Sequence, residues 1–369
     1  MDLRSKFSWL PSAGLEIGMY DEALKKGLAF GEWLEGLKAE KEGTSPYQGM
    51  TQMETIKAKR AQRMAGKVPI PTAFDQLLSN FNLNIGGAVS EKLGKFFQYS
   101  GSEVLMGEYI SQVVAASLIG SSHVGELVAF QERTNASDFR RYYLEDTGDD
   151  LETGELSYKQ ELPDLWIKVG DRSMRLIKYG RYLNANFDDV DNVTFQAFNI
   201  ALNRVGMQIG VGETSEAIRI GVKGDGNSNA AATFNPATTA TIVVADVINM
   251  SDILEDPYTP THIVAKKTQM NQYKAAVVGI YNPVTTLGAV SVDLPKPISW
   301  NKATAQSGLE NDYILVQDSR YCLGGVSTQA VFVESERLVK KQIKGTGIWY
   351  RSAFYKLDNN ACKVMDVTY

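Results

Sequence analysis

The longest regular pattern of apolar residues lies near the middle of the chain. Apolar side chains there recur at alternating steps of three and four positions: Phe195, Phe198, Leu202, Val205 and Ile209. This spacing places all of them along one side of a helix. The pattern predicts one helix from Asp188 toward Arg219, roughly 45 Å long at a rise of 1.5 Å per residue. The glycine-rich turn V-K-G-D-G-N-S-N predicts where that helix ends.

Before this helix the pattern changes to one that is typical of strands. The segment P-D-L-W-I-K-V-G-D-R-S-M-R-L-I-K-Y alternates in stretches between apolar and polar residues. A polar stretch containing Gly148 and Gly154 separates it from an earlier extended segment. The region 126–178 therefore predicts a long β-hairpin.

The first part of the chain predicts helices. Between Asp21 and Lys41 the apolar residues have rough helical spacing, but Gly27, Gly31 and Gly36 weaken that helix by ~1 kcal/mol each relative to alanine. A helix of this kind needs a partner surface to hold it.

Two further helices are predicted before the hairpin. A polar helix with several basic residues is expected over 51–67, where Gly66 and the following prolines end it. An apolar stretch at Tyr109–Ile119 predicts a buried helix.

The region after the long helix predicts a compact α/β unit over 236–333. A helix through V-V-A-D-V-I-N-M-S-D-I-L-E-D precedes the buried strand T-H-I-V-A-K and a helix around T-Q-M-N-Q-Y-K-A-A-V. Further strands are expected at Tyr313–Gln317 and Gln329–Val333. The last residues, 334–369, predict an extended hairpin that ends in A-C-K-V-M-D-V.

Composition narrows the class of protein. The 369 residues are 44% hydrophobic and 22% charged, which is typical of a folded chain with two or more substructures. The net charge of −5 gives no reason to expect a nucleic-acid-binding domain. No apolar run is long enough for a secretory signal or a membrane span. Cys322 and Cys362 are too few for a disulfide framework and lack the spacing of a zinc site, which favours a reducing, intracellular setting.

An acidic stretch occupies the middle of the predicted hairpin. Its carboxylates are Glu145, Asp146, Asp149, Asp150, Glu152 and Glu155. A calcium loop does not fit, because Gly148 and Leu151 stand where that loop needs a ligand and a glycine. Acid/base chemistry, loose cation binding, a solvated tip and a contact with a partner of opposite charge all remain open.

Other signatures of catalysis are missing from the sequence. The histidines are His123 and His262, no G-x-S-x-G elbow is present, and His262 lies in an apolar strand. The turn around Asp225 is not a phosphate loop, since Asn229 replaces the third glycine that a dinucleotide fingerprint needs. The sequence therefore predicts neither an enzyme nor a cofactor or metal site.

Taken in order, these parts resemble the major capsid protein of tailed bacteriophages, which has the Hong Kong phage-type shell fold. The resemblance covers roughly residues 120–369, and the first 120 match less well. It rests on the order of the elements and on two sequence blocks. These blocks are Y-I-L-V-Q-D-S-R-Y-C-L-G-G and E-S-E-R-L-V-K-K-Q-I-K-G-T-G-I-W-Y-R-S-A-F-Y-K-L-D-N-N-A-C-K-V-M-D-V.

The resemblance implies an α+β chain with six regions. They are an N-terminal helical arm at 1–66, its continuation toward the peripheral domain at 67–125, an extended β-hairpin or E-loop at 126–178, a peripheral domain with a spine helix at 179–235, an axial domain at 236–333, and closing strands of the peripheral domain at 334–369.

The resemblance also implies a structural function. Hexamers and pentamers of such a chain would tile an icosahedral head around double-stranded DNA, in a virion assembled in the host cytoplasm. Expected partners are other copies of the chain, scaffolding, portal and decoration proteins, and packaged DNA through weak non-specific contacts, with no membrane. An encapsulin-like nanocompartment shell is the first alternative, and a soluble two-lobed α/β enzyme is the second.

Charge suggests which surfaces would meet in such a shell. Basic residues gather on the arm at 57–67 and near the C-terminus: Lys57, Lys59, Arg60, Arg63, Lys67, Arg337, Lys340, Lys341, Lys344, Arg351 and Lys356. Opposite charges on two projecting elements suit recognition between subunits. The hypothesis is that the acidic tip at residues 145–155 docks on a neighbour's basic arm or basic strand. A tip that is merely solvated is the alternative.

Overall fold

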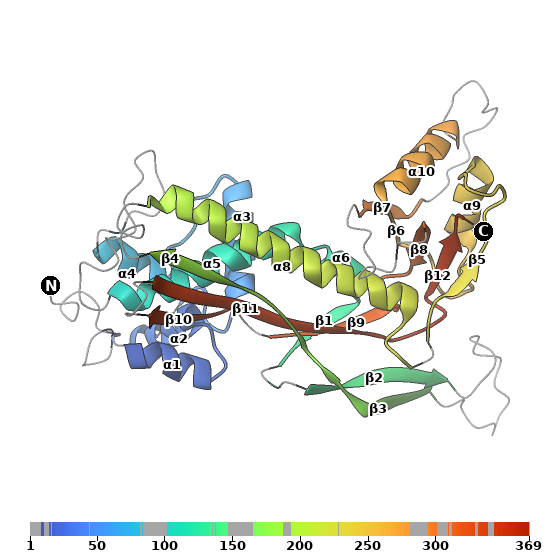
Figure 1. The fold of residues 1–369 in the computed structure, drawn as a ribbon. Helices are drawn as coiled ribbons and strands as arrows, with labels where there is room; N and C mark the ends of the chain where they lie inside the picture. The colour runs from blue at the N-terminus through green and yellow to red at the C-terminus, as the bar shows by residue number, and fades with distance from the viewer. Residues whose placement is uncertain are drawn as a thin grey trace.

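The computed structural model describes most of the chain, and its overall arrangement is shown in Figure 1. The described residues are 9–10, 15, 17–43, 45–81, 83, 102–134, 136, 138–146, 165–186, 193–227, 229–280, 294–300, 309, 312–328, 331–338 and 343–368.

The N-terminal part of the chain is helical. The helix predicted over Asp21–Lys41 is divided in two, because Gly27 adopts a φ of +70° that a continuing helix does not allow. The polar helix ends as predicted, with Gly66 at a φ of +70° after its last turn. The helices before the hairpin are α1 (Ile17–Lys25), α2 (Phe30–Glu42), α3 (Gln52–Met64), α4 (Ala73–Asn80), α5 (Ser102–Ser121) and α6 (Val124–Leu127).

The long helix of the sequence pattern is α8 (Phe195–Lys223), which has 29 residues. It begins later than the predicted Asp188, because the hydroxyl of Thr194 accepts a hydrogen bond from the Ala197 N–H and caps the first turn. It ends where predicted, at Gly224, whose φ is +77°. The apolar stripe faces α5 and the larger sheet, so α8 is a central helix of one hydrophobic core.

The larger sheet lies beneath α8 and α5 in Figure 1. Its strand order is β1-β9-β11-β10, and β4 also pairs with the long strand β11. Pairing is antiparallel except between β1 and β9. The strands are β1 (Phe130–Arg133), β4 (Ile177–Asn186), β9 (Leu323–Ser327), β10 (Phe332–Leu338) and β11 (Ile343–Lys356).

Strand β9 was not predicted, because its sequence L-G-G-V-S contains two glycines. The structure shows what the glycines do. A Cβ at Gly324 would lie 2.5 Å from the Tyr355 ring, and one at Gly325 would lie 3.2 Å from the Phe354 ring. Glycine in a strand often marks such a close approach of a neighbouring group. The low strand propensity of the segment therefore reflects packing of two aromatic rings against the backbone of β9.

A second sheet forms a separate unit with helices α9 (Val244–Asp252) and α10 (Lys267–Ile280). Its strand order is β5-β12-β8-β6-β7, and a second and a third apolar cluster pack on its two faces. The antiparallel pairs and segregated helices of the two units confirm the predicted α+β class. The strands are β5 (Ala232–Phe234), β6 (His262–Ala265), β7 (Lys296–Ser299), β8 (Tyr313–Gln317) and β12 (Cys362–Asp366).

The last strand corrects the expectation that 334–369 close a single unit. Strand β12 leaves the larger sheet and pairs with β8 and β5 of the second sheet. Its side chains explain this position. Cys362, Val364 and Met365 are all buried, so neither face of the strand is left for solvent. A strand buried on both faces belongs in the middle of a sheet that is covered on both sides.

Helices α5 and α8 pack so closely that glycine is required between them. A Cβ at Gly206 would lie 2.5 Å from the carbonyl oxygen of Val114 and 2.7 Å from the Cβ of Ser117. We expect Gly206→Ala to lower the free energy of unfolding by about 1–2 kcal/mol, because overpacking outweighs the gain of up to about 1 kcal/mol in helix propensity. Urea denaturation followed by circular dichroism measures this change.

The matched control for this prediction is Gly36→Ala on α2. No heavy atom lies within 4 Å of a Cβ at that position, so only helix propensity should act. We expect this variant to gain up to about 1 kcal/mol of stability. If Gly206→Ala is as stable as Gly36→Ala, the tight crossing of the two helices is contradicted.

Candidate assembly interface

The third sheet is a hairpin of two strands, β2 (Asp138–Asp146) and β3 (Leu165–Arg175). Pairing runs from Asp138 opposite Arg175 to Asp146 opposite Leu165. In the part of the chain that the structure describes, no third strand pairs with either of them. Isolated two-stranded hairpins are at best marginally stable in water. Among the described residues, both edges of this hairpin are therefore open, and a partner that covered them would stabilise it.

The root of the hairpin is anchored by a small apolar cluster. Buried Leu176, Val326 and Tyr355 form its centre, and Phe139 and Met174 of the hairpin pack against them. The rings of Phe139 and Tyr355 are 5.9 Å apart between centroids. Among the side chains that the structure describes, those of the hairpin in this cluster come from its root, and the outer ends of β2 and β3 extend away from α8 (Figure 1).

An ion pair adds a second anchor at the same root. The Nη1 of Arg141 on β2 lies 2.9 Å from Oδ2 of Asp225, in the turn that ends α8. The side chain of Asp225 is 0% exposed and that of Arg141 is 15% exposed. Asn227 and the backbone N–H of Lys356 also donate to Asp225, at 2.8 and 3.3 Å. One carboxylate thus joins the hairpin, the end of the long helix and β11.

The charged state of Asp225 is favoured by these partners. Burial raises the pKa of a carboxyl, but the hydrogen bond from Asn227 and the charge of Arg141 outweigh it here. The pKa of Asp225 is therefore lowered from its ordinary value. The sequence of the turn predicts only the end of a helix and does not indicate the pairing of Asp225 with Arg141. An aspartate beside the helix-ending glycine is a weak signal for such a role, and its partner is too distant in sequence to be inferred.

Two acidic residues of the hypothesis, Glu145 and Asp146, lie at the outer end of the described part of this hairpin. The backbone of Glu145 pairs with that of Trp166, and Asp146 is the last residue of β2. The other four carboxylates lie outside the described residues: Asp149, Asp150, Glu152 and Glu155. The interpretation of these six as a contact surface therefore stays a prediction.

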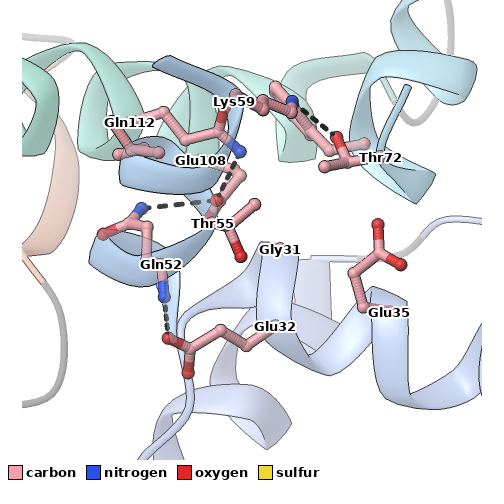
Figure 2. A pocket seen from close by; sticks show the side chains of 11 residues that line it. Gly31, Glu32, Glu35, Gln52, Thr55, Lys59, Thr72, Glu108 and Gln112 are labelled. Atoms are coloured by element: carbon pink, nitrogen blue, oxygen red, sulfur yellow. Dashed lines mark hydrogen bonds between the residues drawn. The ribbon is translucent and has the colours of Figure 1, made fainter. Parts of the chain in front are cut away.

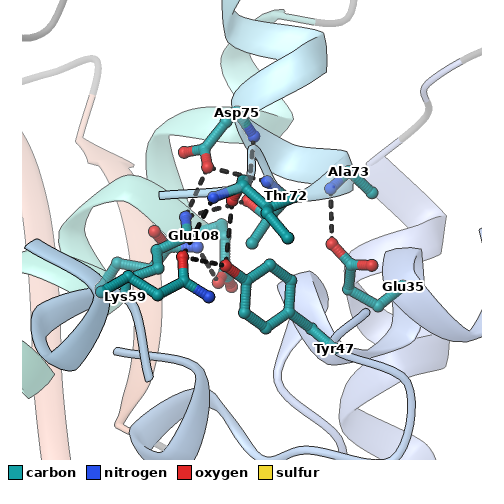
Figure 3. A network of polar contacts seen from close by, with 10 residues as sticks. Glu35, Tyr47, Lys59, Thr72, Ala73, Asp75 and Glu108 are labelled. Atoms are coloured by element: carbon teal, nitrogen blue, oxygen red, sulfur yellow. Dashed lines mark hydrogen bonds and ion pairs between the residues drawn. The ribbon is translucent and has the colours of Figure 1, made fainter. Parts of the chain in front are cut away.

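The basic residues of the arm do not all face the same way. Lys57, Arg60 and Arg63 are exposed on α3, at a spacing that places them on one side of the helix. Lys59, which the sequence grouped with them, instead turns inward and pairs with Asp75 and Thr72 of the next helix (Figure 3). Lys57, Arg60 and Arg63 therefore form the exposed basic face of α3. Lys59 instead joins α3 to the start of α4.

The C-terminal basic residues separate into two groups. The backbone of Arg337 lies directly opposite that of Lys344 in the β10–β11 ladder. Lys340 and Lys341 lie outside the described residues, in the connection between the same strands. Arg351 and Lys356 do not belong with them. Arg351 stacks over the Trp349 ring, and Lys356 is buried with its ammonium 2.8 Å from the carbonyl oxygen of Asn229.

Within one molecule, the described end of the hairpin and the described basic residues lie apart. Figure 1 shows the outer end of the hairpin, where β2 ends and β3 begins, on the same side as the second sheet. Helix α3 and the free end of the β10–β11 ribbon lie toward the opposite end of the molecule. A contact between them would therefore join two copies of the chain.

The N-terminal helices are held on α5 by a polar pocket (Figure 2). The side-chain amide of Gln52 donates to Ser111 at 2.8 Å and to Glu108 at 3.4 Å, and Gln112 donates to Glu108 at 2.9 Å. Burial is the main cause that raises the pKa of Glu108 to about 7. The carboxyl of Glu32 also lies in this pocket, where its charge adds to the effect.

The pocket is a docking surface for the arm. In the described part of the chain, no group of three or more histidine, cysteine, aspartate or glutamate side chains could hold a metal ion. A neighbouring network serves the same purpose: Glu35 accepts from the backbone N–H of Ala73, and Tyr47 donates to the carbonyl of Ile70 at 3.0 Å (Figure 3). The partner surface that the weak N-terminal helix needs is therefore α5 together with α3 and α4.

Among the described residues, no helix is both long enough and apolar enough to span a bilayer.

Comparison with known proteins finds similar solved structures at low identity. No family model and no curated protein matches the sequence. The capsid of a native GTA particle is 14% identical with a TM-score of 0.47, and the match covers 67% of this chain and 90% of that chain. The capsid of Myoviridae phage XM1 is 12% identical with a TM-score of 0.42, covering 65% and 89%. The SrpI encapsulin from Synechococcus elongatus PCC 7942 is 13% identical with a TM-score of 0.47, covering 67% and 88%. The chain is similar in fold to these shell proteins.

Proposed function

We propose that this chain is the major capsid protein of a tailed bacteriophage, a structural subunit and not an enzyme. The observation that carries the proposal is the two-stranded hairpin, which has no third strand among the described residues and is anchored at its root. Such a hairpin is stabilised when a neighbouring subunit covers it. The order of elements and the two sequence blocks support the same function.

Each region has a role in this proposal. The hairpin region, 126–178, reaches over a neighbouring subunit as the E-loop, and α8 is a spine that resists bending. The second sheet with α9 and α10 forms the axial domain around which hexamers and pentamers close, and its strands β5 and β12 lie outside the expected range 236–333. The larger sheet is the peripheral domain, and the N-terminal arm packs against it. Many modest contacts of this kind multiply into a stable lattice.

The assembled particle would be an icosahedral head that encloses double-stranded DNA. It would assemble in the host cytoplasm with scaffolding, portal and decoration proteins, and the chain itself would contact DNA weakly and without sequence preference. An encapsulin-like nanocompartment is the second candidate, because the same architecture can enclose proteins in place of DNA. The content of the particles distinguishes the two, since a phage head holds nucleic acid and a nanocompartment holds a cargo enzyme.

Negative-stain electron microscopy of the purified full chain tests the proposal. Closed particles of uniform size are expected after concentration, with or without a co-expressed scaffolding protein. A chain that stays monomeric in all conditions would contradict the proposal. Sedimentation velocity at several protein concentrations provides the same answer in solution.

Reversing the charge of the hairpin tip is expected to impair assembly while leaving the monomer folded. The double variant Asp149→Lys/Asp150→Lys would place like charges against a neighbour's basic surface, and like-charge contacts cost several kcal/mol at an interface. Since each 1.4 kcal/mol is a factor of ten in an equilibrium constant, the yield of particles should fall by at least about tenfold. Gel filtration measures the yield, and a melting curve checks the fold.

Compensating variants identify the partner surface. Arg60→Glu/Arg63→Glu should restore particles if α3 receives the tip, and Arg337→Glu/Lys344→Glu should restore them if the β10–β11 ribbon does. The control Glu40→Lys/Glu42→Lys makes the same charge change at exposed positions of α2. Normal particles from the hairpin variant would show that the tip is merely solvated.

A further inference from the structure

The chain passes between the two sheets at a junction where two connections lie side by side. One connection leads from β8 to β9 through residues 318–322, and the other leads from β11 to β12 through residues 357–361. The backbone N–H of Asp318 donates to the carbonyl of Ala361 at 2.8 Å, and that of Leu357 donates to the carbonyl of Cys322 at 3.0 Å. Each connection is therefore hydrogen-bonded to the other.

The two cysteines of the chain meet at this junction. Cys322 ends one connection and Cys362 begins the strand after the other, and both side chains are buried. Both cysteines belong to one cluster of buried side chains, and each is the main influence on the pKa of the other. Their separation in the sequence does not indicate this contact. Only the antiparallel pairing of β12 with β8 and of β11 with β9 brings them together.

We infer that Cys322 and Cys362 are a site of reversible disulfide formation, which covalently joins the two connections between the sheets when the chain meets a small-molecule disulfide. The inference does not depend on whether the chain assembles. In a reducing cytosol the pair stays as thiols, and in an oxidising compartment it is convertible to a disulfide.

The surroundings assign different roles to the two sulfurs. The neighbouring Cys322 and the nearby ammonium of Lys356 lower the pKa of Cys362, although burial opposes them. The thiolate is the reactive form of cysteine, so Cys362 is the attacking group. Its sulfur lies 3.9 Å from the carbonyl oxygen of Asn359, a residue of the exposed turn before β12. The sulfur also lies 3.7 Å from the carbonyl oxygen of Gly221, so the proposed reaction requires that turn to open and admit the reagent.

The reaction is an exchange in two steps that balances without another reagent. The Cys362 thiolate attacks one sulfur of the small disulfide, forms a mixed disulfide and expels one thiolate. The sulfur of Cys322 then loses its proton, attacks the Cys362 sulfur of the mixed disulfide and expels the second thiolate. The two protons of the protein thiols end on the two released thiols. The protein pair is oxidised and the small disulfide is reduced.

The test uses the full native chain with 2-hydroxyethyl disulfide as the probe. After incubation, remaining thiols are alkylated and the protein is analysed by intact mass and by peptide mapping. We expect the loss of two hydrogen atoms, no alkylation, and a peptide that links Cys322 to Cys362. The melting temperature should rise by about 5 °C, because the disulfide removes conformational freedom from the unfolded chain. Dithiothreitol should reverse both changes.

Single variants test the assigned roles. Cys322→Ser should accumulate the mixed disulfide on Cys362, whereas Cys362→Ser should react much more slowly, and melting curves confirm that each variant is folded. The inference is overturned if both thiols of the native chain remain open to alkylation while the urea-unfolded chain forms the disulfide. Disulfides between chains would also overturn it. Equal adduct formation by both variants would contradict the assignment of Cys362 as the attacking group.

Discussion

Replacing Asp225 with alanine should lower the free energy of unfolding by about 3–5 kcal/mol, the largest effect that we expect from a single substitution. The change removes the acceptor of Arg141 and leaves that guanidinium largely buried beside the hairpin root. It also leaves the Asn227 amide and the Lys356 N–H without their acceptor. Chemical denaturation of the purified chain measures the loss.

The effect should be specific to the buried pair. Asp252→Ala, at an exposed position of α9, serves as the control and should change stability by less than about 0.5 kcal/mol. In a double-mutant cycle, Arg141→Met combined with Asp225→Ala should cost less than the sum of the two single changes, because the residues contact each other. Additive losses would show that the ion pair does not anchor the hairpin.

Raising the pH from 5 to 8 should weaken the fold, with Glu213 as a main cause. Glu213 lies on α8, and its carboxylate accepts long hydrogen bonds from Ser122 at 3.2 Å and from Gln131 and Tyr350 at 3.4 Å. Burial outweighs these partners and raises the pKa of Glu213 from 4.5 to about 7. Between these two values the folded chain binds more protons than the unfolded chain, so stability falls as the pH rises.

The size of this effect follows from the shift. The raised pKa of Glu213 corresponds to about 3 kcal/mol in the free energy of unfolding. This stability is lost progressively between pH 4.5 and 7 and is not regained at higher pH. Glu108, whose pKa is also raised to about 7, should add a similar loss at the docking surface of the N-terminal arm. Denaturation curves at several pH values measure the slope.

Glutamine at position 213 removes the titrating proton and keeps the shape of the side chain. We expect Glu213→Gln to be more stable than the native chain at pH 8 and to show a flatter dependence on pH. The hydroxyls of Ser122 and Tyr350 can turn to accept hydrogen bonds from the new amide. Glu40→Gln on the exposed face of α2 is the control and should leave the slope unchanged. An unchanged slope for Glu213→Gln would rule out this carboxyl as the cause.

Local patterns of the sequence predicted the elements whose own residues determine them. The long helix α8 follows from a stripe of apolar residues, and the end of α3 follows from Gly66. The alternation around Trp166 likewise predicted a strand of the hairpin. In each case the information lies within a few turns or residues of the element, so no knowledge of distant contacts is required.

The features that sequence reasoning missed all depend on contacts between distant segments. Strand β9 exists because Gly324 and Gly325 receive aromatic rings from β11. Strand β12 lies in the second sheet because that sheet buries both of its faces. Asp225 and Arg141 of the candidate interface are separated by β3, β4 and α8, and Cys322 and Cys362 are separated by β9, β10 and β11. Nothing in the composition near any of these residues indicates its partner.

The direct continuation of β3 into β4 has a mechanical consequence. Only Leu176 separates the two strands, and β4 pairs with β11 from Ile177 opposite Ser352 to Asn186 opposite Ile343 (Figure 1). A pull on the outer end of the hairpin along its strands would load this ladder in shear. Its hydrogen bonds would resist together, whereas peeling would break them one after another. Tension on the hairpin would therefore be transmitted through β4 to the sheet beneath α8.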